Sequence, residues 1–130
     1  MQQSYKNFVD VNLLFSKIQK VNVMEYYTTV SAMDFSKIIL NPSIVLLDVR
    51  TPEEYAEGHI ANAMNIDFTA PEFMEKVKAS IAVDKEVAVY CRSGKRSASA
   101  AEQMSDSGYK VTNMAGGIID WTATGLPVQK

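Results

Sequence analysis

The chain has few of the residues from which proteins build disulfides and metal centres, with one cysteine and one histidine among 130 residues. A single cysteine excludes an intrachain disulfide and any metal site that needs several thiolates. The formal net charge of −2 argues against nucleic acid or a membrane surface as partner, because both attract basic proteins. No stretch approaches the roughly 18 uninterrupted apolar residues of a membrane helix. The sequence therefore describes a globular domain with no implied metal or cofactor, and it directs attention to its one cysteine.

That cysteine, Cys91, lies between an apolar run, Val87 to Tyr90, and a cationic segment that extends to Ser97. The residues after this segment, from Ala98 to Met104, favour a helix. A strand, a tight loop and a helix N-terminus together form a cradle for an anion. A thiol at the first position of such a loop is held as the thiolate, which is the reactive form of cysteine. The alternative is a buried structural cysteine beside a surface cluster of charge.

The loop needs hydrogen bonds as well as positive charge to ionise the thiol. Lowering the pKa of a cysteine by two units takes about 2.7 kcal/mol. A helix dipole supplies roughly 0.3–1 kcal/mol, whereas a hydrogen bond to a charged group supplies about 1.5–3 kcal/mol. Most of the stabilisation must come from backbone N–H groups, which Gly94 allows to turn inward. The basic side chains of Arg92, Lys95 and Arg96 favour an anionic substrate.

Segments typical of strands and helices alternate from residue 26 onward. Strands are expected at residues 26–30, 44–47, 63–66, 87–90 and 111–114. Helices are expected at residues 32–40, 52–57, 72–80, 95–107 and 117–124. This alternation predicts an α/β fold with a five-stranded, mostly parallel sheet covered by helices on both faces. Ligands of such sheets bind beyond the carboxyl ends of the strands, where Cys91 is placed.

Residues 1–24 differ from the rest and are predicted to be an N-terminal extension to a domain over residues 25–130. Phe8, Val11, Phe15 and Ile18 recur at helical spacing, which indicates an amphipathic helix that packs on the domain or serves a partner. The first residues lack the basic and apolar regions of a secretory signal, so a cytoplasmic location is expected. A periplasmic form trimmed of its signal would have the same sequence.

Three motifs follow one another along the chain. The first runs from Leu47 to Tyr55 and continues from Gly58 to Ala63. The second is Cys91-Arg92-Ser93-Gly94-Lys95-Arg96-Ser97, and the third is Gly116 to Trp121 followed by Gly125-Leu126-Pro127-Val128. In this order and spacing they resemble the signatures of the single-domain rhodaneses, a family of sulfurtransferases, over residues 26–128.

The resemblance implies a rhodanese-like domain and a persulfide mechanism. Cys91 would take a sulfane sulfur from a small anion such as thiosulfate, then pass it to cyanide, to a thiol or to a protein acceptor. By position, the persulfide would be cradled by Arg92, Ser93, Gly94, Lys95, Arg96 and Ser97. The side chains of Lys95 and Arg96 would bind the oxyanion group of the donor.

Three polar residues of the first motif are expected to support the site. Asp48 and Arg50 are predicted to hydrogen-bond neighbouring loops, in preference to a role for Asp48 as acid or base. His59 is the only histidine, and a structural hydrogen bond is favoured over a dyad with Cys91.

Two other functions remain open at this stage. One is a non-catalytic persulfide carrier or protein-interaction module. The intact cysteine and the cationic loop disfavour an inert module, but they do not separate an enzyme from a carrier. The other, weaker alternative is a cysteine-dependent phosphatase or arsenate reductase. Phosphatase loops place histidine before the cysteine and arginine six positions after it, whereas Tyr90 and Ser97 occupy those positions here.

Overall fold

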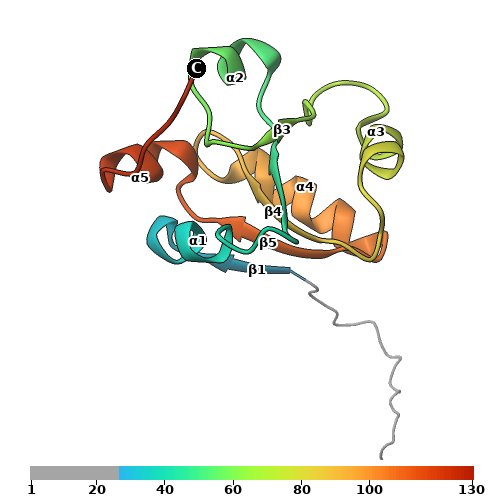
Figure 1. Ribbon diagram of the computed structural model, residues 1–130. Coiled ribbons are helices and arrows are strands. Elements are labelled where there is room, and N and C mark those ends of the chain that lie inside the picture. Colours follow the sequence, from blue (N-terminus) through green and yellow to red (C-terminus); the bar gives the residue numbers. More distant parts are fainter. Residues whose placement is uncertain (1–26) are drawn as a thin grey trace, which may run out of the picture.

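The computed structural model describes residues 27–130, and the extension predicted over residues 1–24 lies outside them (Figure 1). Strands and helices alternate throughout the described part. In chain order the elements are β1 (Tyr27–Val30), α1 (Ala32–Ile38), β2 (Val45–Asp48), α2 (Pro52–Glu57), β3 (Met64–Asn65), α3 (Phe73–Ser80), β4 (Glu86–Tyr90), α4 (Lys95–Asp106), β5 (Lys110–Met114) and α5 (Gly117–Ala123). No helix in this part of the chain is both long and apolar enough to cross a membrane.

The strands form one sheet in the order β1-β5-β4-β2-β3. Every neighbouring pair is parallel, so all five strands end at the same edge. In the centre of the sheet, Val89 of β4 lies between Leu47 of β2 and Asn113 of β5. The predicted α/β fold with a parallel five-stranded sheet is confirmed.

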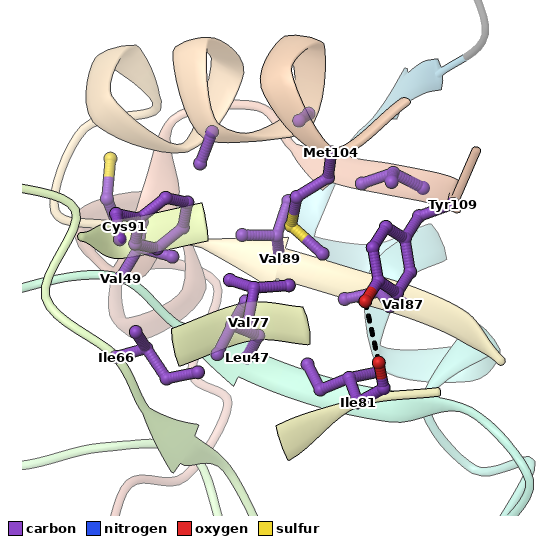
Figure 2. Packing of buried hydrophobic residues seen from close by; sticks show 14 residues of the cluster. Leu47, Val49, Ile66, Val77, Ile81, Val87, Val89, Cys91, Met104 and Tyr109 are labelled. Carbon is purple, nitrogen blue, oxygen red and sulfur yellow. Dashed lines mark hydrogen bonds between the residues drawn. The ribbon is translucent and has the colours of Figure 1, made fainter. Parts of the chain in front are cut away.

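Hydrophobic side chains cover both faces of the sheet. On one face, Leu47 and Val89 pack with Val77 of α3 and Met104 of α4 (Figure 2). The other cluster is formed by Leu46, Ala88, Tyr90, Phe35 of α1 and Trp121 of α5, together with further buried residues. Successive residues of a strand point to opposite faces, so a strand between two helical layers is apolar at every position. The uninterrupted runs of the sequence therefore lie in the central strands, as predicted.

The helix ends follow from local hydrogen bonds. Ser31 caps α1 by accepting a 3.1 Å bond from the backbone N–H of Asp34. The helix expected at residues 32–40 ends at Ile38, because the N–H groups of Leu40 and Asn41 bond only three residues back. The strand expected at residues 63–66 shortens to two residues at the edge of the sheet. These differences leave the carboxyl edge of the sheet unchanged.

Candidate active site

Cys91 directly follows β4 at the carboxyl edge of the sheet. It is 1% exposed and belongs to the hydrophobic cluster beneath α3 and α4. Figure 2 shows Cys91 at one end of this cluster, with its sulfur turned toward the helix above the sheet. The thiol thus lies at the bottom of the loop that joins β4 to α4.

Gly94 shapes this loop around the sulfur. Its backbone N–H donates a 3.1 Å hydrogen bond to Sγ of Cys91. Its φ of +105° lies in the region that favours glycine, and α4 begins at the next residue. A Cβ at this position would lie 3.2 Å from the backbone nitrogen of Gly116. Glycine therefore both permits the turn and lets the loop approach the end of β5.

The third sequence motif binds the backbone of the Cys91 loop. The N–H of Ile118 donates to the carbonyl of Cys91 at 2.9 Å, and that of Ile119 to the carbonyl of Arg92 at 3.2 Å. A Cβ at Gly117 would lie 2.3 Å from the Arg92 carbonyl oxygen, so only glycine permits this approach. Because α5 takes the carbonyl groups, the N–H groups of the loop are left to turn toward the sulfur.

The environment of Cys91 favours the thiolate. Burial, the largest influence, acts to raise the pKa of the Cys91 thiol. The hydroxyl and backbone N–H of Ser97, and the backbone N–H groups of Gly94 and Ser93, act in the opposite direction and prevail, so the pKa is lowered. The Ser97 hydroxyl acts on the pKa of the thiol, but its oxygen forms no hydrogen bond of good geometry within the described residues.

The three cations of the loop differ in their environment. Arg92 and Lys95 are exposed, and Arg96 is partly buried. Arg96 forms a two-pronged ion pair with Glu54 of α2, at 2.8 Å and 2.9 Å. The hydrogen bond from Arg96 is the main cause that lowers the pKa of Glu54 to about 2. The loop therefore presents two exposed cations that form no ion pair with residues 27–130, and one that is fixed by a carboxylate.

Glu54 was not singled out from the sequence. The signal for it was present, because Thr51 and Glu54 have the spacing of a capping box. In the structure Glu54 accepts from the backbone N–H of Thr51 at 3.0 Å, and Thr51 accepts from that of Glu54 at 3.2 Å. The cap places the carboxylate at the start of α2, where Arg96 reaches it.

Asp48 and Arg50 form a buried ion pair after β2. Nη2 of Arg50 lies 2.6 Å from Oδ2 of Asp48 and donates at 2.7 Å to the carbonyl of Gly58. Burial acts to lower the pKa of Arg50, but the hydrogen bond and charge of Asp48 outweigh it and the pKa is raised. The pair links the end of β2 to the end of α2, and its recorded bonds do not involve the Cys91 sulfur.

His59 lies in the same supporting region. Its ring stacks on Tyr55 at a centroid distance of 3.7 Å, and Nδ1 lies 2.9 Å from the Tyr55 carbonyl oxygen. Its backbone exchanges two 2.8 Å hydrogen bonds with Gln129. Within the described residues these contacts join α2 to the C-terminal segment, and none of them is with the Cys91 loop.

A cleft of about 280 Å³ opens beside the loop. It is lined by charged groups from Arg50, Glu57 and Arg92, and by the apolar side chains of Ile119 and Val128.

Among residues 27–130 no cluster of three or more histidine, cysteine or carboxylate side chains could hold a metal ion.

The comparisons with known proteins agree with this architecture. The sequence model of the family described as "Rhodanese-like domain" matches residues 31–124. A protein of Allochromatium vinosum named sulfurtransferase is 40% identical over 87 residues, which cover 65% of this chain and 78% of the relative. The crystal structure of a rhodanese-related protein from Thermoplasma volcanium superposes with a TM-score of 0.71 at 39% identity, covering 79% of this chain and 98% of that one.

A third relative has a different name. The tRNA uridine(34) hydroxylase of Salmonella newport is 33% identical over 118 residues, which cover 83% of this chain but 32% of the relative. The shared part is thus one portion of a larger protein. The residues matched by the family model include the Cys91 loop. The chain belongs to the rhodanese-like domain family.

Proposed function

We propose that the protein is a sulfurtransferase that carries sulfane sulfur as a persulfide on Cys91. The observation that carries this proposal is the environment of Cys91 Sγ. The sulfur is buried and accepts a hydrogen bond from the Gly94 N–H, and the loop lowers the pKa of the thiol. Such a site stabilises negative charge on sulfur before and after the transfer. The sulfurtransferase name of the Allochromatium relative supports the same chemistry.

The transfer takes place in two displacements. The Cys91 thiolate attacks the sulfane sulfur of thiosulfate, the S–S bond of the donor breaks, and sulfite leaves with the electron pair. The persulfide that forms bears its charge on the outer sulfur, within the loop. An acceptor such as cyanide or a thiolate then attacks this outer sulfur, and Cys91 is released as the thiolate. The exposed cations Arg92 and Lys95 attract the anionic donor to the mouth of the loop.

The dimensions of the loop favour sulfur over phosphate as the transferred group. Arg96, the last arginine of the loop, is five positions after Cys91 and is held by Glu54. A phosphatase uses an arginine one position later to surround the phosphoryl oxygens, and Ser97 occupies that position here. The matched residues make up 32% of the tRNA hydroxylase relative, so its name describes a larger protein.

The first experiment is intact-protein mass spectrometry after incubation with thiosulfate, before and after addition of cyanide. We expect a gain of one sulfur atom that cyanide removes. Cys91→Ser is the control and should gain nothing. A folded protein that gains no sulfur from thiosulfate or from polysulfide contradicts the proposal, and Cys91-dependent hydrolysis of an aryl phosphate would support the phosphatase alternative.

Turnover distinguishes an enzyme from a carrier. An enzyme produces thiocyanate continuously from thiosulfate and cyanide, whereas a carrier releases one equivalent and reloads slowly. We expect continuous turnover, and we expect it to persist when residues 1–24 are deleted, because every site residue lies in the rhodanese-like domain. Loss of turnover in a deletion variant that still folds would assign the extension a part in the reaction.

A further inference from the structure

Two buried polar atoms of the described residues have no hydrogen-bond partner: Oγ of Ser97 and Oδ1 of Asn113. Ser97 is 0% exposed and Asn113 is 3% exposed. Buried polar side chains are hydrogen-bonded in the large majority of cases, so each exception needs an explanation. No other buried side-chain nitrogen or oxygen within residues 27–130 shares this condition.

Both atoms lie on the same side of the sheet, near the Cys91 loop. Asn113 is two residues from Val111, which packs in the cluster beneath α4, so the alternation of a strand directs Asn113 to the same face. Ser97 belongs to the first turn of α4, on the buried side of the helix. The loop before it meets the end of β5, since a Cβ at Gly94 would lie 3.7 Å from the Met114 carbonyl oxygen. The first turn of α4 thus covers the end of β5.

We propose that Asn113 is a positioning residue for sulfur transfer, because its Oδ1 is the second acceptor of the Ser97 hydroxyl. The hydroxyl donates to Cys91 Sγ in the thiolate state and to Asn113 in the persulfide state. This inference rests on the proposed function, and it adds a residue that none of the three sequence motifs contains.

The need for a second acceptor follows from the movement of charge. When the thiolate attacks the sulfane sulfur and sulfite leaves, the negative charge passes from Sγ to the outer sulfur. Sγ then has two covalent bonds and is a weak acceptor, so the buried Ser97 hydroxyl loses its partner. A buried donor without a partner is unfavourable and would disfavour the loaded protein. Ser97 Oγ and Asn113 Oδ1 are not hydrogen-bonded to each other in the structure, so the hydroxyl reaches Asn113 by a change of the Ser97 side-chain rotamer about the Cα–Cβ bond, without movement of the backbone.

The first test measures the two states separately. In the reduced protein, the ultraviolet absorbance of the thiolate is followed against pH, and Ser97→Ala is expected to raise the pKa of Cys91 while Asn113→Leu leaves it unchanged. In the loading equilibrium with thiosulfate and sulfite, Asn113→Leu is expected to reduce the persulfide fraction on the order of tenfold. The double variant, Ser97→Ala with Asn113→Leu, tests whether the two residues act together. In the absence of the Ser97 hydroxyl, Asn113→Leu should no longer reduce the persulfide fraction.

Two matched control residues lie in α4 and β5, the elements that contain Ser97 and Asn113. Ser105 is a buried serine of α4 whose hydroxyl donates to the Glu102 carbonyl at 3.0 Å, so Ser105→Ala should alter neither quantity. Thr112 neighbours Asn113 on the opposite face of β5, and Thr112→Val should also leave both unchanged. If Asn113→Leu reduces the persulfide fraction by the same factor with and without the Ser97 hydroxyl, the proposal is overturned.

A measurement on the unaltered Asn113 covers the case in which Asn113→Leu does not fold. The side-chain amide signals of Asn113 in isotope-labelled protein should shift when sulfur is loaded, and the shift should be absent in Ser97→Ala. Loading that is proven by mass without any shift overturns the inference but leaves the sulfurtransferase function intact. A wild-type protein that takes up no sulfur overturns the function, and the inference with it.

Discussion

Arg96 and Glu54, which are 42 residues apart in the chain, connect the second sequence motif to the first. Nη1 of Arg96 donates to Oε1 of Glu54 at 2.8 Å, and Nη2 donates to Oε2 at 2.9 Å. The same carboxylate accepts from the backbone of Thr51 and fixes the first turn of α2. One carboxylate therefore determines both where α2 begins and where the last cation of the Cys91 loop is held.

The charge of Arg96 should matter for the reactivity of Cys91. The two groups are close enough that the thiolate helps to raise the pKa of Arg96, after the larger contribution of Glu54. We expect Arg96→Gln to raise the pKa of Cys91 and to lower kcat/KM for thiosulfate by roughly tenfold, which corresponds to one charge-assisted hydrogen bond. The pH profile of kcat/KM measures both effects.

Arg92→Gln is the comparison for this change, because it removes an exposed loop cation that forms no ion pair in the described part of the chain. It should raise KM at low salt and leave the pH profile in place. If Arg96→Gln leaves the pH profile unchanged as well, the charge of Arg96 does not act on the thiol.

The Arg96–Glu54 pair should also make stability depend on pH. The hydrogen bond from Arg96 is the main cause that lowers the pKa of Glu54 from 4.5 to about 2. Because the pKa is lower in the folded state, the ionised carboxylate stabilises the fold above about pH 4.5, and this contribution is lost as the pH falls toward 2. Glu54→Gln is expected to lower the free energy of unfolding at neutral pH and to flatten its decline between these two values.

Urea unfolding at several pH values measures this prediction, with Glu53→Gln as the control. Glu53 is an exposed residue of the same helix, and it forms no ion pair among the residues that the structure describes. Its variant should follow the wild-type curve. Parallel curves for Glu54→Gln and wild type would show that the pair does not contribute to acid stability.

Substitution of two glycines with positive φ allows the effect of backbone strain to be measured separately from that of steric contact. Gly117 has φ +59° and Gly125 has φ +88°, but a Cβ at Gly125 would have no atom within 4 Å. Gly125→Ala should therefore destabilise the fold by about 1 kcal/mol, from strain alone, and leave turnover unchanged. Gly117→Ala must also displace the backbone of Cys91 and Arg92, so we expect a loss of about 2–4 kcal/mol and reduced turnover in the folded protein.

Thermal unfolding and turnover at a temperature where both variants are folded check this prediction. A Gly117→Ala protein that matches Gly125→Ala in both measurements would mean that the loop tolerates displacement of the Cys91 and Arg92 carbonyls. The hydrogen bonds from Ile118 and Ile119 would then not position the sulfur.

The elements of the fold were predictable because local sequence patterns specify them. The run from Ile44 to Leu47 predicted a strand buried on both faces, and Leu46 and Leu47 lie in the two opposite core clusters. The position of Cys91 after a strand and before a helix likewise placed it at the carboxyl edge. In each case neighbouring residues contain the whole signal.

The contacts between motifs were not predictable in the same way. Alternating strands and helices are compatible with several strand orders, so the sequence alone did not place α5 behind the Cys91 loop or α2 beside Arg96. Neither Glu54 nor Asn113 was singled out from the sequence. Their positions relative to the sulfur depend on which elements meet at the edge of the sheet, which is a property of the whole fold.

Substitution of His59 tests whether this residue stabilises the fold or takes part in sulfur transfer. Its ring stacks on Tyr55, and the backbone of His59 pairs with Gln129. His59→Gln removes the stacking and keeps a polar side chain, so we expect a loss of about 1 kcal/mol in stability, close to the contribution of one aromatic pair. Turnover with thiosulfate and cyanide should be unchanged, because the hydrogen bond and ring stacking of the imidazole within residues 27–130 are with Tyr55 and not with the Cys91 loop. Urea unfolding and steady-state turnover of one preparation measure both quantities. A variant with wild-type stability and abolished turnover would instead place the imidazole in the transfer of sulfur.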